Sequence, residues 1–94
     1  MSDIRFEWDE AKSRQNVRKH GVSFEEAETV FFDDHAIRFF DPDYSDDEDR
    51  FIMLGVSHKL RVLIVCHCYG ESDSVIRIIS ARKANRQEST HYRR

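Results

Sequence analysis

The feature that most constrains the fold is a period of two in the apolar residues from Arg50 onward. It marks three segments, Arg50–Val56, Leu60–Tyr69 and Val75–Ala81, in which side chains alternate in the manner of strands. Ser57–Lys59 separates the first two segments, and Gly70–Ser74 separates the last two. Strands joined by connections this short pair with their neighbours in the antiparallel direction. The pattern therefore predicts an antiparallel meander.

The residues upstream of this meander predict one short strand and a first helix. Ile4–Trp8 alternates as a strand does and leads into Asp9, a residue type that caps helix N-termini well. Glu10–His20 has the composition of a helix, and Gly21 follows it in the position typical of a C-terminal stop. Because its apolar content is low, this helix is expected to lie on the surface.

A second helix is predicted to begin after Ser23. Glu26 follows three residues later and completes the pattern of a capping box. The apolar residues of this helix recur at helical spacing and predict one buried stripe. They are Phe24, Ala27, Val30 and Phe31.

The remaining segments complete the predicted topology. Ala36–Phe40 is expected to form a strand that ends at the turn signal Asp41-Pro42-Asp43, and Arg82–Tyr92 is expected to form a closing helix. The predicted order is β-α-α-β-β-β-β-α. This order indicates an α+β fold in which helices cover one face of a curled, mainly antiparallel sheet.

Length and composition limit the class of protein. The 94 residues are enough for one domain, residues 1–94, and seven Phe, three Tyr and one Trp supply bulky side chains for one core. No apolar stretch has the roughly 18 residues of a membrane span, and the first residues lack an apolar leader. A cytoplasmic protein without contact to a membrane is expected.

Charge is unevenly distributed along a chain whose net charge is −3. Residues 33–49 hold eight acidic side chains and one basic one, whereas residues 74–94 hold six basic side chains and one acidic one. Lys12, Arg14, Arg18 and Lys19 form a second basic cluster. Such polarity can steer a polyanion to one face, and it is equally compatible with solvated surfaces that bind nothing.

Two arginines mark the most informative segment for function. Arg77 interrupts an apolar strand, and Arg82 follows at the end of this strand. A guanidinium among apolar residues requires an anionic partner, and two of them suit a phosphodiester because their planar donors bind anionic oxygens in bidentate fashion. Structural ion pairs with the many carboxylates are the alternative interpretation.

Strand alternation sorts the other side chains that can carry chemistry. Arg77 is expected to share a face with Ile79 and Ala81, and Arg50, His67 and Arg77 can converge on one patch if their strands are neighbours. His67 is a candidate acid or base because the ordinary pKa of histidine lies near neutrality. A buried, hydrogen-bonded histidine of purely structural role is the alternative.

These residues fit the cleavage of RNA through its own 2′-hydroxyl. This reaction requires a group that accepts the 2′-hydroxyl proton, a group that protonates the leaving 5′-oxygen, and positive charge around the phosphorane. Glu48 is a second candidate base, beside Arg50, while Arg77 and Arg82 would provide the positive charge. No metal or other cofactor is expected, since the chain has neither CxxC pairing nor HExxH spacing and lacks a phosphate-binding glycine loop.

The chain resembles the BrnT family. Each motif of the resemblance is short, but their order and spacing together are specific and extend from Phe6 to Tyr92. The motifs are Phe6-Glu7-Trp8-Asp9, Lys12, Asn16, Lys19-His20-Gly21-Val22-Ser23-Phe24-Glu25-Glu26-Ala27, Glu48-x-Arg50-Phe51, Leu54-Gly55, Arg77-Ile78-Ile79-Ser80-Ala81-Arg82 and Glu88-x-x-x-Tyr92.

The resemblance implies the toxin of a type II toxin–antitoxin system, with a RelE-like fold and a ribonuclease activity that blocks translation. It further implies a small BrnA-like antitoxin of the ribbon-helix-helix class and binding of the pair to operator DNA. As catalytic residues it favours Arg77 and Arg82, with His67, Glu48 and Arg50 beside them. The expected RNA-binding residues are Lys12, Lys83, Arg86 and Tyr92. The alternative is a non-catalytic module whose basic face binds a protein partner or operator DNA.

Overall fold

The computed structural model describes residues 3–44, 48–70 and 72–92. Its helices are α1 (Glu10–His20), α2 (Phe24–Thr29) and α3 (Arg86–Tyr92), with short 3₁₀ turns at Val30–Phe32 and Pro42–Tyr44. Its strands are β1 (Arg5–Glu7), β2 (Ile37–Asp41), β3 (Arg50–Val56), β4 (Val62–Tyr69) and β5 (Val75–Lys83). The predicted order β-α-α-β-β-β-β-α is confirmed. Residues 45–47 of the acidic segment, and Arg93 and Arg94 of the basic one, lie outside the described residues.

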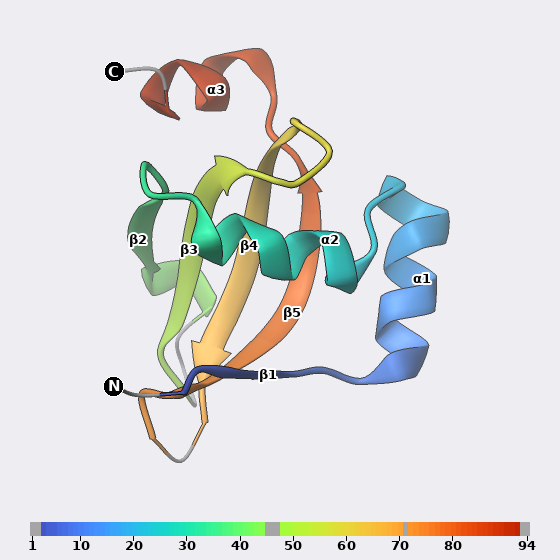
Figure 1. Cartoon of the computed structure of the whole chain (residues 1–94), viewed down its shortest axis with the longest axis vertical. Coiled ribbons are helices and arrows are strands. Elements are labelled where there is room, and N and C mark those ends of the chain that lie inside the picture. Colours follow the sequence, from blue (N-terminus) through green and yellow to red (C-terminus); the bar gives the residue numbers. More distant parts are fainter. Residues whose placement is uncertain (1–2, 45–47, 71, 93–94) are drawn as a thin grey trace.

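The five strands form one open, mixed sheet in the order β1-β5-β4-β3-β2. β2, β3, β4 and β5 pair with their neighbours in the antiparallel direction, which confirms the predicted meander, and β1 pairs with β5 in parallel. α2 crosses in front of the sheet, α1 stands beside β5, and α3 lies beyond the end at which β5 finishes (Figure 1). Within the described residues, no helix is both long enough and apolar enough to cross a membrane.

The predicted start of the closing helix is wrong. The closing helix was expected from Arg82, but β5 continues through Lys83 and α3 begins only at Arg86. The reason is a local cap: Asn85 Oδ1 accepts a hydrogen bond from the backbone N–H of Glu88, and Glu88 Oε1 accepts one from the backbone N–H of Asn85. This reciprocal capping box fixes the helix start, and Arg82 is left as a strand residue.

The helices α1 and α2 begin and end where local chemistry places them. Asp9 accepts a hydrogen bond from the backbone N–H of Lys12, and Gly21 ends α1 in the left-handed region with a φ of 71°. Ser23 Oγ accepts from the backbone N–H of Glu26, so that half of the predicted capping box is present. The Glu26 carboxylate accepts instead from Ser57 Oγ and from the Arg61 guanidinium, and it thereby joins α2 to the β3–β4 turn.

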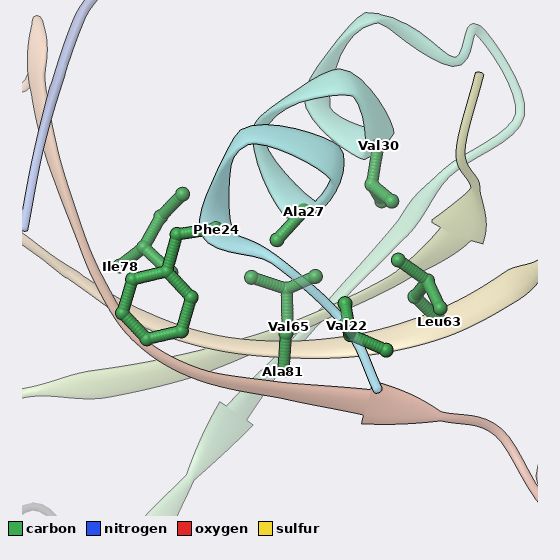
Figure 2. Close-up of a cluster of buried hydrophobic side chains, with 8 residues drawn as sticks. All are labelled: Val22, Phe24, Ala27, Val30, Leu63, Val65, Ile78 and Ala81. Atoms are coloured by element: carbon green, nitrogen blue, oxygen red, sulfur yellow. The ribbon is translucent and has the colours of Figure 1, made fainter. Parts of the chain in front are cut away.

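The core lies between α2 and the sheet. Phe24 and Ala27 of α2, and Val30 of the 3₁₀ turn that follows it, point toward the strands, as Figure 2 shows, and the predicted buried stripe is confirmed for these three residues. The fourth, Phe31, is half-buried and packs at the margin of the cluster. The strands supply Leu63, Val65, Ile78 and Ala81, and the segment before α2 supplies Val22.

α1 is attached to β5 through one buried side chain. Asn16 Nδ2 donates to the carbonyl oxygens of Val22 and Ala81 at 2.8 Å each, and Asn16 Oδ1 accepts from the backbone N–H of Ala81 at 3.2 Å. β1 pairs with β5 only as far as Arg77. The Asn16 amide therefore takes the place of a neighbouring strand at Ala81 and sets the position of α1 beside the sheet.

Candidate functional site

A β-bulge in β5 decides which side chains face away from α2. His67 pairs with Ile78 and Cys66 pairs with Ser80, so Ile79 is an extra residue without a partner on β4. Regular alternation would place Arg77 and Arg82 on opposite faces because they are five residues apart. One extra residue shifts the alternation and places both on the same face.

This bulge corrects one prediction. Ala81 was expected to share a face with Arg77, but Ala81 is buried in the core opposite Val65. Strand alternation was applied across a segment whose period changes at Ile79, and sequence alone does not reveal such an insertion. The alternation predicted for β3 and β4, which have no bulge, is confirmed.

The first part of the site is a row of residues across three strands. Arg50 on β3 and Arg77 on β5 are both direct cross-strand partners of Cys68 on β4, so all three side chains share one face. Glu48 lies 3.6 Å from Arg50 through its carboxylate oxygen. Burial and then the nearby Glu48 carboxylate raise the pKa of the Cys68 thiol, so Glu48 is close to Cys68 as well as to Arg50.

The second part is an open depression of about 420 Å³ on the same face. Arg50 and Arg82 both line it, so two of the predicted arginines share one concave surface. The other lining residues are Asp41, Ile52, Ile64, Cys66, Ile79 and Ser80. Its lining combines apolar side chains with two cations, as in sites that hold a ligand by a few placed charges.

Each of the arginines also contacts a carboxylate. Arg77 pairs with Glu7 on β1 at 2.8 Å, and both side chains are about half exposed. Arg82 binds Glu88 in bidentate fashion, with Nη1–Oε1 at 2.9 Å and Nη2–Oε2 at 2.8 Å. The prediction of an anionic partner is therefore met within the protein. Ion pairs this exposed contribute little to stability, so a phosphate can replace or share the carboxylate.

Two of these carboxylates, Glu7 and Glu88, were not among the predicted site residues. Glu7 belongs to the N-terminal motif, and only the pairing of β1 beside β5 brings it to Arg77. The Arg82 guanidinium, with help from the Asn85 backbone N–H, lowers the pKa of Glu88 to about 2. The spacing of Asn85 and Glu88 was the available sequence signal, since it has the form of a capping box.

His67 does not join Arg50 and Arg77, and the prediction that the three converge is wrong. It lies on the face toward α2 and is fully buried. Phe31, Phe51 and Tyr69 surround its ring at centroid distances of 4.8, 6.1 and 5.6 Å. Burial lowers the pKa of His67 to about 4, so the ring is neutral near pH 7. A buried neutral ring on the opposite face cannot reach a substrate on the arginine face.

The predicted RNA-binding residues lie outside this depression. Tyr92 donates from its hydroxyl to Asp33 Oδ2 at 2.6 Å, and this bond raises the pKa of Tyr92 to about 12. Lys83 and Arg86 are exposed near the start of α3. Lys12 lines a separate depression beside β5.

Neither cysteine has the features of a nucleophile or a metal ligand. Cys66 and Cys68 are free thiols, and burial raises the pKa of both. Over the part of the chain that the structure describes, no group of three or more His, Cys, Asp or Glu side chains is placed to hold a metal ion. The chemistry available on this face is that of guanidinium groups and carboxylates.

Comparisons with known proteins identify the family of the chain. The family described as "Ribonuclease toxin, BrnT, of type II toxin-antitoxin system" matches residues 8–88. The chain is also similar to the crystal structure of the Brucella abortus ribonuclease toxin BrnT, with a TM-score of 0.65 and 25% sequence identity over 88% of this chain and 99% of that one. No curated protein matches the chain. Since the family match covers most of the sequence, this chain belongs to the BrnT family of ribonuclease toxins of type II toxin–antitoxin systems.

Proposed function

We propose that this protein is a cytoplasmic toxin that cleaves RNA without a metal ion on the face that carries Arg50, Arg77 and Arg82. The observation that carries the proposal is the bulge at Ile79, which brings Arg77 and Arg82 to the face of Arg50 and Glu48. Three guanidinium groups beside an open depression provide the fixed positive charge that a phosphorane requires. RNA cleavage that blocks translation fits the family to which the chain belongs.

In the proposed reaction Glu48 is the general base. Its carboxylate accepts the proton of the RNA 2′-hydroxyl as the 2′-oxygen forms a bond to phosphorus. The bond from phosphorus to the 5′-oxygen breaks, and the leaving oxygen takes its proton from water, which has access to this open face. The hydroxide that remains takes the proton from Glu48, and the carboxylate is thereby restored. The products are a 2′,3′-cyclic phosphate and a free 5′-hydroxyl. Arg50 pairs with Glu48, and Arg77 is close enough to interact with it electrostatically. These two arginines bind the phosphate oxygens, and Arg82 holds the RNA strand in the depression.

The family membership supports a proposed partner as well. A type II system pairs its toxin with an antitoxin protein, and we infer a BrnA-like antitoxin of the ribbon-helix-helix class that neutralises this toxin. The complex would then bind operator DNA through the antitoxin. Co-purification with the product of an adjacent reading frame tests this pairing, and a toxin that stays unbound and active in its presence contradicts it.

The test of the activity is cleavage of RNA by the purified protein in excess EDTA. The Arg77→Ala variant is expected to lose about 10²- to 10³-fold in rate, as the removal of one preorganised donor does in other sites. Arg14→Ala is the matched control, because it removes the same charge from an exposed position on α1 that lines neither the arginine depression nor the one beside α1. RNA that survives the folded wild-type protein would support the non-catalytic binding module. Equal rates for both variants would remove Arg77 from the mechanism.

A further inference from the structure

A second depression, of about 300 Å³, lies between α1 and the bulged part of β5. Lys12 and Lys19 contribute its positive side chains, and Gln15 and His20 contribute polar ones. The reaction proposed above uses none of these side chains, and only Lys12 among them was expected from the sequence to bind RNA. The depression therefore raises the question of which ligand it takes.

Helical spacing explains why these side chains gather. Residues 12, 15, 16, 19 and 20 recur at intervals of three and four, so they lie on one face of α1. Asn16, in the middle of this face, is buried and bonded to the Ala81 backbone. The position of Lys12 and Lys19 beside β5 is thus fixed by the fold, although their ammonium groups are exposed.

The charge of this depression differs from that of the arginine depression. No carboxylate lines it, and none of the ion pairs found among the described residues involves Lys12, Lys19 or His20. Arg50, Arg77 and Arg82, by contrast, each pair with a glutamate. Cations that are gathered in a concave surface without an internal counter-charge are placed to bind an external anion.

The two depressions adjoin one another at the bulge. Ile79 and Ser80 line both of them, on either side of the same strand. An anionic chain that occupies the arginine depression can therefore continue over Ser80 and reach Lys12 and Lys19. Lysine binds phosphate as a flexible point charge, which suits contacts that position a strand without reading its bases.

We propose that the depression between α1 and β5 binds a backbone phosphate of the same RNA strand, next to the nucleotides held by the arginines. This inference rests on the proposed function in so far as RNA is the ligand. The site makes longer RNA bind more tightly than a dinucleotide, and it leaves the chemical step to Glu48 and the arginines. Its contacts are independent of base sequence.

The experiment compares two double variants. Lys12→Ala/Lys19→Ala removes the cations of the depression, and Arg14→Ala/Arg18→Ala removes the same charge from residues of α1 that do not line it. Fluorescence anisotropy measures the binding of a labelled single-stranded oligonucleotide and of a dinucleotide over a series of salt concentrations. Thermal unfolding checks that both variants remain folded.

The lysine variant is expected to bind the oligonucleotide about tenfold more weakly at low salt. Its slope of log K against log salt is expected to become shallower by about 0.7 for each phosphate that the variant no longer neutralises. Dinucleotide affinity stays unchanged, and the Arg14→Ala/Arg18→Ala variant keeps most of the wild-type slope. Equal slopes in the two variants, or equal losses for dinucleotide and oligonucleotide, would overturn the proposal. Because binding is measured apart from cleavage, an inactive protein that still shows the difference contradicts the proposed function and supports this site.

Discussion

The two faces of the sheet hold polar side chains of the same types, but these side chains have a structural role on one face and are available for binding on the other. On the face toward α2, Glu26 is buried and binds Arg61 and Ser57, and His67 is buried among aromatic rings. On the other face, Arg77 pairs with Glu7 at the surface. The closed face fixes the fold with groups that cannot exchange partners. The open face carries groups whose partners a ligand can replace.

The contrast is sharpest between the pair Arg61–Glu26 on the closed face and the pair Arg77–Glu7 on the open face. The Glu26 side chain is 1% exposed, whereas the Glu7 side chain is 46% exposed. A buried carboxylate that loses its partner groups destabilises the fold, because water does not solvate its charge. An exposed carboxylate that loses its partner is solvated by water, so the loss costs little stability. The same pair of residue types is therefore structural in one place and available for binding in the other.

Removal of Glu26 is expected to give the largest effect on stability. Glu26→Ala leaves Arg61 and Ser57 without their shared acceptor, and we expect a loss of about 3 kcal/mol in the free energy of unfolding, with Arg61 partly relieved by solvent. Denaturant unfolding at pH 7 measures this loss. Glu7→Ala is the matched control and is expected to leave the free energy of unfolding nearly unchanged. A similar loss in both variants would remove the distinction between the faces.

Acid provides a second test of the same pair. Hydrogen bonds from Arg61 lower the pKa of Glu26, so its contribution to stability is present above the ordinary glutamate pKa and is lost as the pH falls toward the lower value of the folded state. The Glu26→Ala variant is expected to lack this part of the acid sensitivity, which denaturant unfolding at a series of acidic pH values measures.

The local elements of this fold could be predicted from sequence. The caps at Asp9 and Ser23, the stop at Gly21 and the two-residue period of β3 and β4 depend on neighbouring residues, and these are visible in the chain. The start of α3 was missed because the capping pattern of Asn85 and Glu88 was not recognised. The order of β3, β4 and β5 followed from their short connections, whereas the parallel pairing of β1 with β5 was not predicted.

The composition of the site could be predicted only in part. Arg50, Arg77, Arg82 and Glu48 were expected and do gather on one face, but for a reason that sequence does not show, the extra residue in β5. His67 was misplaced because a histidine in a strand gives the same signal whether its face is open or covered. Glu7 was missed because it reaches Arg77 across about 70 residues of chain.

The buried side chain of His67 predicts a further dependence of stability on pH. The folded protein has a His67 pKa of about 4, below the unfolded value near 6.5, so the unfolded chain takes up a proton first as the pH falls. The stability contributed by the neutral ring is complete above pH 6.5 and is lost between about 6.5 and 4, up to about 3 kcal/mol. His67→Phe is expected to remove this pH dependence, as unfolding measured across this range will show.

The same variant tests the position of His67. Phenylalanine fits among Phe31, Phe51 and Tyr69, so the variant is expected to fold and to cleave RNA at the wild-type rate. His58→Ala, at an exposed position, serves as the control that keeps the pH dependence. A folded His67→Phe protein that no longer cleaves RNA would mean that His67 takes part in the reaction. This result would contradict the separation of the two faces.

The smallest expected effect concerns the pair of Arg82 and Glu88 on the open face. Glu88→Gln keeps a side-chain acceptor at the third position of α3, so the capping box can persist while the charge is lost. We expect a loss of no more than about 1 kcal/mol in the free energy of unfolding, because solvent screens this partly exposed pair. The contribution of Glu88 to the free energy of unfolding is present above pH 4.5 and is lost as the pH falls toward the folded-state pKa of about 2. This contribution is expected to vanish in the variant.

Arg82 without this partner is expected to bind a single-stranded oligonucleotide more tightly at low salt, as fluorescence anisotropy will measure. Arg82→Ala/Glu88→Gln is the control that cancels the gain. An affinity that stays at the wild-type value in Glu88→Gln would mean that Arg82 serves the start of α3 and not the ligand.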